Sequence, residues 1–305
     1  MSLIEHFMKK GPTGFGYGST AEEVTAGLSL VGKTILVTGC NSGLGQEALR
    51  VLSLRGAQVI GTARTLDKAK AACAEVTGKT FPVACELADP ASVKASVAEI
   101  KKLGLKIDAI ICNAGIMALP KLKQAYGLEL QFFTNHIGHF ILVTGLIDQL
   151  AEDGRVVMLS SSAHSMAPKA GIEFDNLSGA KGYRDWTAYG QSKMANLLFS
   201  KELARRFKGS RRTSNAVHPG VIRTNLGRHM NPIMNRVFGL VGPLVLKSVP
   251  QGATTEVFAA VHPAVAGVSG AYFANSNIAK ARADADDAAL GRKLWEESEK
   301  IVARL

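Results

Sequence analysis

The sequence predicts an α/β fold built on a doubly wound parallel sheet of about seven strands, with helices on both faces. Strand-like apolar runs alternate with helical stretches from Lys33 to Phe273, and this alternation favours parallel strands joined by right-handed crossovers. The runs are apolar at nearly every position, which is typical of strands covered on both faces. A glycine-rich loop separates the first run from the first helical stretch.

Each expected element follows from a run of residues between polar or turn-forming positions. The apolar runs predict strands at Thr34–Thr38, Gln58–Thr62, Thr80–Cys85, Ala109–Cys112, Arg155–Ser160, Thr213–Val217 and Gly270–Phe273. Helical patterns predict helices at Leu44–Leu54, Asp67–Val76, Pro90–Lys102, Tyr126–Leu150, Ala188–Phe207, Pro250–Val261 and Ala288–Val302. Asp89 before Pro90 is a typical helix start, because Asp caps the first turn and Pro is well tolerated at the first helical position.

The remaining segments define the domain organisation. Residues 1–30 are expected to form an N-terminal extension, in which the glycine-rich stretch Gly11–Thr20 favours a loop or a partly ordered arm. Residues 31–305 are expected to form a single Rossmann-fold domain. Two insertions, Ser165–Thr187 and about 222–249, follow the carboxyl ends of strands, where open α/β sheets bind ligands. We therefore expect them to contact substrate, with 222–249 forming a substrate lobe.

The chain is strongly basic. Its 305 residues include 36 Lys and Arg against 25 Asp and Glu, for a formal net charge of +11. Nine basic residues and one acidic residue lie between Lys201 and Arg236. This stretch fits a nucleic-acid surface or a solvated helix face near an anionic cofactor. We expect no nucleic-acid partner, because the stretch has almost no aromatic residues on which bases could stack.

Cysteine usage and apolar runs bear on the cellular compartment. Cys40, Cys73, Cys85 and Cys112 lack metal-binding spacing, so buried reduced thiols are expected. The N-terminus lacks a secretory apolar region, and no apolar run approaches the roughly 20 residues that span a bilayer. We therefore expect a cytoplasmic protein without a transmembrane segment.

The loop from Thr38 to Gly45, Thr-Gly-Cys-Asn-Ser-Gly-Leu-Gly, carries the clearest chemical signal. Its glycines let the backbone pass close to a pyrophosphate, and the helix that follows offers free N–H groups and a positive dipole end. The glycine spacing is Gly-x-x-x-Gly-x-Gly rather than Gly-x-Gly-x-x-Gly, a difference that distinguishes families of dinucleotide-binding proteins. The loop alone predicts a bound dinucleotide.

Tyr189 and Lys193 are four residues apart on a predicted helix, so their side chains share one face. A lone phenol is a poor acid or base at neutral pH. An ammonium about 4 Å away is worth about 4 kcal/mol at an effective dielectric constant of ~20, enough to bring the pKa of the phenol toward neutrality. Taken alone, the pair also fits an ordinary surface Tyr and Lys.

Further polar residues stand near the ends of predicted strands. Ser160, Ser161 and Ser162 follow the fifth strand, where a hydroxyl can bind a substrate oxygen, and Asn113-Ala114-Gly115 follows the fourth. Asn135 lies in an apolar helix and needs partners if it is buried. It fits a core Asn or a residue that holds a proton-relaying water. His136 and His139 flank it without a third ligand at a matching place, so a zinc site is not expected.

Six motifs in this order resemble the short-chain dehydrogenase/reductase family over about residues 30–275. They are Thr38 to Gly45, Asn113 to Gly115, Asn135, Ser161, Tyr189 with Lys193, and Pro219-Gly220. Within that family, Ala163-His164, Phe174 to Leu177, Ala188 to Lys193 and His218 to Val221 are similar to the retinol-dehydrogenase and WW-domain-oxidoreductase group. That group acts on retinoids, steroids or other lipophilic carbonyls in the cases known.

The resemblance implies roles for the matching residues. Tyr189 would exchange a proton with substrate, Lys193 would lower the pKa of Tyr189 and bind the nicotinamide ribose, and Ser161 would orient the substrate oxygen. Asn135 would support the relay water. Expected cofactor contacts are Gly39, Asn41, Ser42, Gly43, Leu44, Gly45, Arg64, Glu86, Leu87, Asn113, Ala114, Gly115, Tyr189, Lys193, Pro219, Gly220, Val221 and Thr224. No metal is expected.

The chain departs from the family pattern at several places. The gap between Ser161 and Tyr189 is longer than usual, although the related group has a similar insertion. Glu86 stands where the family usually has Asp, and Cys112 replaces a frequent Asn. The choice of Ser161 over its two neighbours rests on alignment with the family.

The end of the second strand indicates the cofactor. A carboxylate there would bind the ribose hydroxyls of NAD, but the sequence Val59 to Thr65 contains none, and Asp67 is expected to lie at the start of the next helix. Arg64 is available, and a guanidinium matches phosphate geometry. The sequence therefore predicts NADP(H) as the cofactor.

These features predict an NADP(H)-dependent oxidoreductase that transfers a hydride between nicotinamide and a carbonyl or alcohol. A lipophilic aldehyde, ketone or secondary alcohol is expected, because Asn231–Val249 is rich in apolar residues. The same segment also fits ordinary packing or a contact in a homo-oligomer. The alternative function is a non-catalytic NADP(H)-binding redox sensor or scaffold. The complete Ser-Tyr-Lys-Asn set counts against it, because a sensor does not need these residues.

Overall fold

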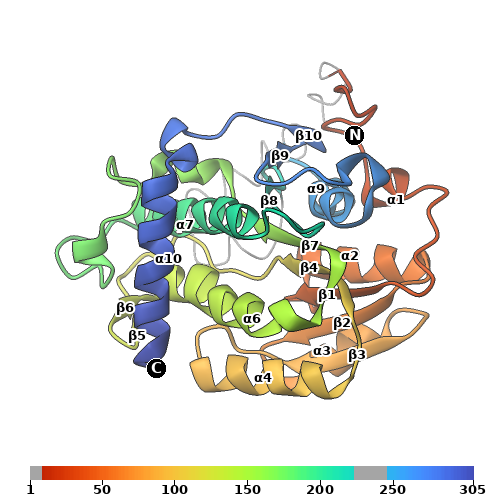
Figure 1. The fold of residues 1–305 in the computed structure, drawn as a ribbon, viewed down its shortest axis with the longest axis horizontal. Coiled ribbons are helices and arrows are strands. Elements are labelled where there is room, and N and C mark those ends of the chain that lie inside the picture. Colours follow the sequence, from red (N-terminus) through yellow and green to blue (C-terminus); the bar gives the residue numbers. More distant parts are fainter. Residues whose placement is uncertain (1–8, 223–245) are drawn as a thin grey trace.

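A computed structural model, which describes residues 9–222 and 246–305, confirms the doubly wound α/β fold (Figure 1). The strand order in its central sheet is β10-β9-β8-β7-β4-β1-β2-β3. The parallel strands are β1 (Thr34–Thr38), β2 (Gln58–Ala63), β3 (Thr80–Ala84), β4 (Ile107–Cys112), β7 (Leu150–Leu159), β8 (Thr213–His218) and β9 (Tyr272–Ala274). At the edge, β10 (Asn277–Ile278) pairs antiparallel with β9.

The direction of winding reverses at β1. From β1 the chain proceeds outward through β2 to β3, and then it crosses back to β4 on the other side of β1. Thr34 pairs with Gln58 on one side, and Ile35 pairs with Ala109 on the other. A doubly wound sheet binds ligands in the crevice beyond the carboxyl ends of such strands. The topology therefore places the ligand site beyond β1 and β4.

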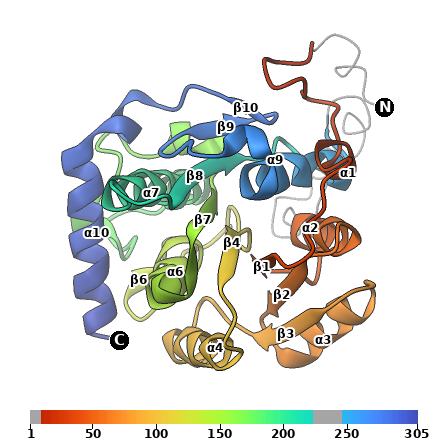
Figure 2. The ribbon, with the colours of Figure 1, turned by 45° about the vertical axis from the view of Figure 1, so that its right-hand side comes forward.

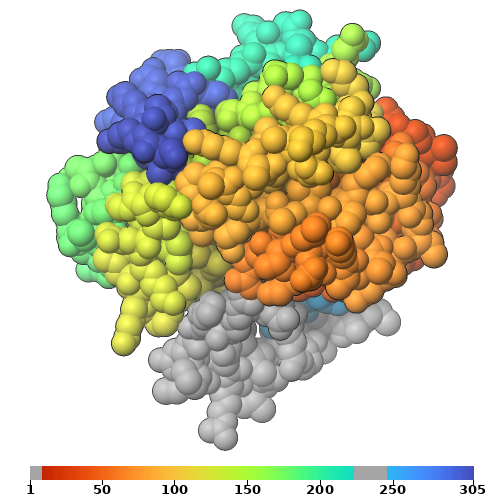
Figure 3. All heavy atoms as spheres, turned by 90° about the horizontal axis from the view of Figure 1, so that it is seen from below, coloured from red at the N-terminus to blue at the C-terminus, as the bar shows by residue number. Residues whose placement is uncertain are grey.

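Helices cover both faces of the sheet (Figure 2). One face packs α2 (Gly43–Leu54), α3 (Leu66–Ala74) and α9 (Val249–Val261), and the other packs α4 (Pro90–Lys102), α6 (Gly138–Leu146) and α7 (Asp185–Arg206). Each layer has its own apolar core. The last helix, α10 (Ala288–Ala303), packs on α7 through the buried residues Leu294 and Trp295, and it appears in dark blue on the surface in Figure 3.

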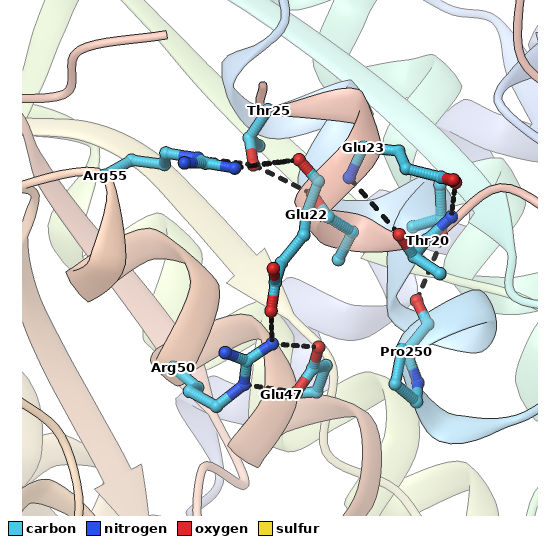
Figure 4. A network of polar contacts seen from close by, with 10 residues as sticks. Thr20, Glu22, Glu23, Thr25, Glu47, Arg50, Arg55 and Pro250 are labelled. Carbon is cyan, nitrogen blue, oxygen red and sulfur yellow. Dashed lines mark hydrogen bonds and ion pairs between the residues drawn. The ribbon is translucent and has the colours of Figure 1, made fainter. Parts of the chain in front are cut away.

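The described part of the N-terminal extension is attached to α2 and α9. Its short helix α1 (Ala21–Val24) buries Ala21 and Val24 in the core that α2 and α9 share. Figure 4 shows the polar contacts beside it. Arg50 of α2 binds the carboxylate of Glu22 and donates to Glu47 at 2.8 Å, while Arg55 donates to Thr25 Oγ1 at 3.0 Å. These contacts join residues 20–25 to the first helix of the fold.

The glycine-rich stretch before α1 is held by the edge of the sheet. Asn277 Oδ1 accepts hydrogen bonds from the backbone N–H of Thr13 at 3.1 Å and from its hydroxyl at 3.0 Å, while Asn277 Nδ2 donates to Phe15 O at 3.0 Å. Thr254 of α9 donates to Ser19 O at 2.6 Å. The segment therefore lacks regular secondary structure but is bonded at several points along its length.

Most predicted element boundaries agree with the structure, but the long helix predicted at Tyr126–Leu150 is wrong at its start. A hairpin of β5 (Gln124–Ala125) and β6 (Leu128–Glu129) precedes the helix, which begins at Leu130. Tyr126 and Gly127 both have positive φ, 51° and 76°, the conformation of a two-residue type I′ turn. In addition, β7 begins at Leu150 rather than Arg155, and α7 begins at Asp185 rather than Ala188.

The helix from Leu130 onward is not uniform, because it contains α5 (Leu130–Phe132), the π-helical turn Phe133–Ile137, and α6. Among the described residues, this stretch alone is long and apolar enough to cross a membrane. The stretch Leu130–Gln149 has a mean hydropathy of 1.2, and 78% of its window is buried inside the protein. Polar residues interrupt this stretch, so it is not a continuous apolar run and the sequence did not indicate it as a possible membrane span. Its burial is typical of a core helix.

The bonds of Asn277 give a test of how the arm is held. Asn277→Ala removes three hydrogen bonds to residues 13–15, so we expect the free energy of unfolding to fall by about 1 to 2 kcal/mol. Urea unfolding measures it, with exposed Lys280→Ala as a control that changes it by less than about 0.5 kcal/mol. Equal stability of the two variants would contradict a bonded arm.

Candidate functional site

A cavity of about 320 Å³ lies beyond the carboxyl ends of β1, β2, β3 and β4. Eleven predicted cofactor-contact residues line it. They are Gly39, Asn41, Ser42, Gly43, Leu44, Arg64, Glu86, Leu87, Asn113, Ala114 and Gly115. Residues outside the prediction also contribute, among them Thr38, Thr62, Ile116, Met117 and Thr134. The topology thus brings together residues that lie as far apart in the sequence as the first and fourth strands.

The glycine loop needs glycine for packing as well as for access. Gly39 has φ of 71°, a conformation that other residues rarely adopt. A Cβ on Gly45 would lie 2.4 Å from Gly39 O and 2.5 Å from Asn113 Nδ2. Gly45 does not line the cavity and instead lets the first turn of α2 approach β4. The predicted cofactor contact at Gly45 stays a prediction, since Gly45 is not among the residues that line the cavity.

The N-terminus of α2 has no side-chain cap. Ser42 occupies the cap position without a capping hydrogen bond, and the first turn holds no acidic residue. In contrast, Thr65 caps α3 and Asp89 caps α4 with side-chain oxygens. The first N–H groups of a helix need partners, and a helix N-terminus attracts anions. This end of α2 therefore suits a phosphate group.

A set of hydrogen bonds holds the ends of β1 and β4 together. Asn113 Nδ2 donates to Thr38 O at 2.8 Å, and Ala114 N donates to Thr38 Oγ1 at 3.0 Å. His139 Nε2 lies 2.9 Å from the same hydroxyl, and its Nδ1 lies 2.9 Å from Asn135 O. Burial lowers the pKa of His139 to about 4, so this ring is neutral. Both of its nitrogens have structural partners.

Asn135 lies in the π-helical turn and is fully buried. Its Oδ1 accepts from Ile116 N at 2.8 Å, and its Nδ2 donates to Ile116 O at 2.9 Å and to Ser192 Oγ at 2.9 Å. A Cβ on Gly115 would lie 2.9 Å from Asn135 Oδ1 and 3.6 Å from Lys193 Nζ. Asn135 thus connects the segment after β4 with α7, and its amide is already satisfied by protein groups.

Tyr189 and Lys193 both lie on the buried face of α7, with relative exposures of 5% and 3%. Lys193 Nζ donates to Leu159 O at the end of β7, at 2.9 Å. The same nitrogen lies 5.7 Å from the centroid of the Tyr189 ring. The predicted surface alternative for this pair is therefore excluded, and the strand end holds the ammonium next to the phenol.

The three serines after β7 have different surroundings. Ser160 is buried and donates to Lys193 O at 2.8 Å. Ser161 is half-buried, its hydroxyl accepts from Ala163 N at 3.1 Å, and it acts to lower the pKa of Tyr189, while Ser162 is exposed. Of the three, Ser161 is the one that affects the pKa of Tyr189, and its catalytic role stays a prediction.

The pKa of Tyr189 departs from the expectation. Burial raises it to about 12, and the hydrogen bond from Ser161 only partly opposes this rise. Burial also lowers the pKa of Lys193 to about 8, and the nearby charge of Glu256 counteracts that effect. The expected lowering of the phenol's pKa is therefore not found in this structure, because desolvation of the buried phenol outweighs the opposing effect of Ser161.

The segment after β8 reaches the same edge of the sheet. Pro219 is buried, Gly220 has φ of 99°, and Val221 is 52% exposed. A Cβ on Gly220 would lie 2.7 Å from the side chain of Lys247. None of the three lines the cavity beyond β1 to β4. Thr224 and most of the predicted 222–249 lobe lie outside the described residues.

The basic stretch lies at the opposite edge. A hollow of about 770 Å³ at the amino ends of β7 and β8 is lined by six basic and two acidic residues. Lys201 pairs with Asp286 at 2.5 Å, and Arg211 pairs with Glu152 at 2.8 Å. Because α7 runs antiparallel to the strands, its basic C-terminus lies far from the glycine loop. The expectation that this part of the stretch lies near the cofactor is wrong.

Two other expectations concern cysteine and histidine. The four cysteines are free and buried, as predicted, and the sulfur atoms of Cys40 and Cys73 would each lie 3.0 Å from a Cβ placed on Gly61. His136 Nε2 lies 2.9 Å from Ser298 Oγ of α10. Within residues 9–222 and 246–305, no group of three or more potential metal ligands occurs.

The sequence did not predict the buried acidic residue Glu256. Glu256 of α9 is fully buried and interacts electrostatically with Lys193. It lies on the apolar stripe formed by Ala253, Val257 and Ala260. A carboxyl group on the core-facing side of a predicted helix is the signal that could have identified it.

The sequence matches the family model described as short chain dehydrogenase over residues 33–234. Chloroplastic short-chain dehydrogenase TIC 32 B of Brassica napus is 39% identical, and the match covers 97% of each chain. Human retinol dehydrogenase 14 is 36% identical over 90% of this chain and 87% of its own. These relatives span nearly the whole described fold.

Solved structures agree with the sequence matches. A crystal structure of an uncharacterised protein from Mycobacterium paratuberculosis superposes with a TM-score of 0.76 at 31% identity, covering 94% of this chain and 98% of the other. A blue fluorescent protein from a metagenomic library, solved in complex with NADPH, gives a TM-score of 0.65 at 25% identity, covering 81% and 97%.

The bonds of Asn135 lead to a stability prediction. Asn135→Ala leaves Ile116 N, Ile116 O and Ser192 Oγ without this partner, so we expect the free energy of unfolding to fall by about 2 to 4 kcal/mol. Chemical denaturation checks this, with exposed Asn41→Ala as a control expected to be nearly neutral. An Asn135→Ala protein as stable as the control would mean that this amide does not organise the site.

Proposed function

The chain belongs to the short-chain dehydrogenase family and is an oxidoreductase, and we propose that it transfers a hydride between NADP(H) and a carbonyl or alcohol carbon. The observation that carries this proposal is the convergence of Ser161, Tyr189 and Lys193 at the end of β7. Ser161 acts to lower the pKa of the phenol, and Lys193 Nζ lies 5.7 Å from the centroid of its ring. These groups suit proton exchange with a substrate oxygen.

The residues around the cavity fit a dinucleotide. The uncapped N-terminus of α2 suits the pyrophosphate, and Gly39, Gly43, Asn113 and Gly115 lie along the wall of the same cavity. When bound there, NADP(H) would supply or accept the hydride. The relative solved with NADPH supports the same cofactor class.

The chain's own residues would handle the proton and the substrate oxygen. Tyr189 would donate a proton to the oxygen during reduction and accept one during oxidation. Ser161 would hold the oxygen by a hydrogen bond and stabilise the charge that develops there. The positive charge of Lys193 would favour the phenolate form of Tyr189, and Asn135 would hold its segment in place through Ile116.

Arg64 supports NADP(H) over NAD(H). It follows β2 directly, lines the cavity and is exposed. It makes no hydrogen bond or ion pair with any other residue of the described ranges. Because Ala63, Arg64 and Thr65 include no carboxylate to bind ribose hydroxyls, the guanidinium is suited to the additional phosphate of NADP.

The proposed substrate is a lipophilic aldehyde, ketone or secondary alcohol. Two observations support it: relatives that are retinol dehydrogenases and the apolar composition of residues 231–249. The alternative, a non-catalytic redox sensor or scaffold, is disfavoured by the burial of Tyr189 and Lys193 against the strand end. Such a protein would have no need of an ammonium held beside a phenol.

Replacing the phenol tests the reaction class. We expect Tyr189→Phe to lower turnover of carbonyl substrates by at least about 10² to 10⁴-fold, because general acid catalysis is lost, while the Kd for NADPH changes little. Tyr126→Phe, which alters an exposed tyrosine on the β5–β6 turn, is the matched control and should keep full turnover. Substantial turnover by Tyr189→Phe would overturn the assignment.

Replacing Arg64 tests the cofactor. We expect Arg64→Leu to raise the KM for NADPH by about 10- to 100-fold, since a charge-assisted hydrogen bond is worth roughly 1.5 to 3 kcal/mol, and to leave the KM for NADH nearly unchanged. Arg211→Leu removes an exposed arginine at the opposite edge and is the control. A wild-type protein that uses NADH better than NADPH would contradict the proposal.

A further inference from the structure

The two tryptophans of the chain have very different surroundings. Trp295 of α10 is 5% exposed, its indole stacks on Phe199 with ring centroids 5.5 Å apart, and its Nε1 donates to Glu299 at 2.7 Å. Trp186, in the first turn of α7, is half-buried. Within residues 9–222 and 246–305 it belongs to neither apolar core, and its Nε1 donates to no other group. The packing of the fold therefore uses Trp295 but leaves much of Trp186 available.

Helical spacing places Trp186 on the same face of α7 as Tyr189 and Lys193, because the three residues stand three and seven positions apart. Lys193 Nζ reaches Leu159 O at the end of β7. Since α7 runs antiparallel to the strands, its first turn extends past their carboxyl ends. At a rise of 1.5 Å per residue, Trp186 lies roughly 10 Å beyond Lys193 along the helix axis. An open α/β sheet binds its ligands on this side.

The neighbouring flank of α7 faces a different space. Arg184, Thr187, Ala188 and Gln191 line a hollow of about 410 Å³ that does not include Trp186. The indole is therefore oriented toward the Tyr189 side of the helix rather than toward that hollow.

The indole is in direct contact with the phenol ring. The ring centroids of Trp186 and Tyr189 are 6.1 Å apart with an interplanar angle of 82°, which is an edge-to-face arrangement. Beside this pair, a Cβ on Gly190 would lie 2.6 Å from Ala163 O, so the 3₁₀ turn that ends at Met166 packs tightly on α7. Met166 is 44% exposed. Accessible apolar groups from two elements thus lie close to the phenol.

We infer that Trp186 is a specificity-determining residue, which contacts the group next to the substrate carbonyl and favours aldehydes and ketones whose carbonyl carries an aromatic or conjugated group. A substrate oxygen bound at Tyr189 brings that group next to the indole, because the two rings touch. A planar π system can stack on an indole or meet it edge-on, an attraction that a saturated ring of the same size lacks. The inference rests on the proposed function, since Tyr189 must bind the carbonyl oxygen.

The kinetic test uses two aldehydes of similar size, benzaldehyde and cyclohexanecarbaldehyde, with NADPH. The ratio of their kcat/KM values is compared between proteins, so the intrinsic reactivity of each aldehyde cancels. We expect Trp186→Leu to lower the ratio of aromatic to saturated substrate by about three- to tenfold, because the aromatic attraction is lost. Trp186→Phe should restore most of it. Trp295→Phe, which changes the other tryptophan, is the control and should keep the wild-type ratio.

A second measurement does not depend on turnover. Trp295→Phe leaves Trp186 as the single tryptophan of the chain, so acrylamide quenching of the remaining fluorescence reports the accessibility of this indole. NADPH and benzyl alcohol are both reduced and cannot react with each other. We expect benzyl alcohol, added to the NADPH complex, to lower the quenching constant by about twofold or more, because a ligand pocket covers most of a bound ring and of the wall it touches. Cyclohexanemethanol should protect less.

The two readouts separate the possible failures. An equal loss of activity toward both aldehydes in Trp186→Leu, or no change in their ratio, would overturn the preference for aromatic groups. Quenching that benzyl alcohol leaves unchanged up to its solubility limit would overturn the contact itself. If Trp186→Leu does not fold, Trp186→Met replaces it. If the wild type turned over no carbonyl or alcohol substrate, the proposed function would fail, and the quenching experiment would still decide whether Trp186 lies in a ligand site.

Discussion

The charge on Lys193 is the constraint on which the rest of the candidate site depends. An ammonium with 3% relative exposure is unfavourable unless protein groups replace its water. Leu159 O accepts a hydrogen bond from this ammonium at 2.9 Å, and the centroid of the Tyr189 ring lies 5.7 Å from it. These two partners belong to β7 and α7, so the strand end and the helix must pack together before the lysine can remain charged.

The doubly wound topology is what makes this arrangement achievable. Parallel strands end at one edge, and the reversal at β1 opens a crevice there. Hydrogen bonds between Thr38, Asn113 and Ala114 join the carboxyl ends of β1 and β4. The π-helical turn places Asn135 against the segment that follows β4. The binding end of α2 and the polar end of β7 thus face a common space, although they belong to separate parts of the sequence.

The sequence was sufficient for the sheet and for most residues around the cavity, because continuous apolar runs and glycine spacing are local signals. It failed where the structure depends on tertiary contacts or on local backbone geometry. The I′ turn at Tyr126 and Gly127 resembled helix because the residues that follow it continue into the apolar helix. The role of Gly45 is to admit Asn113, and the raised pKa of Tyr189 reflects its complete burial. Glu256 was not identified, although it is a single charged residue on the apolar, core-facing side of a predicted helix.

We propose that the phenol, hydroxyl and ammonium at the end of β7 serve hydride transfer from a nicotinamide. The most direct measurement is the fate of deuterium from NADPH that carries deuterium at both C4 positions, during reduction of a lipophilic ketone or aldehyde. The proposed reaction predicts that the label appears on the former carbonyl carbon of the alcohol product, and that Tyr189→Phe abolishes this transfer. Consumption of labelled NADPH without deuterium on that carbon would contradict it.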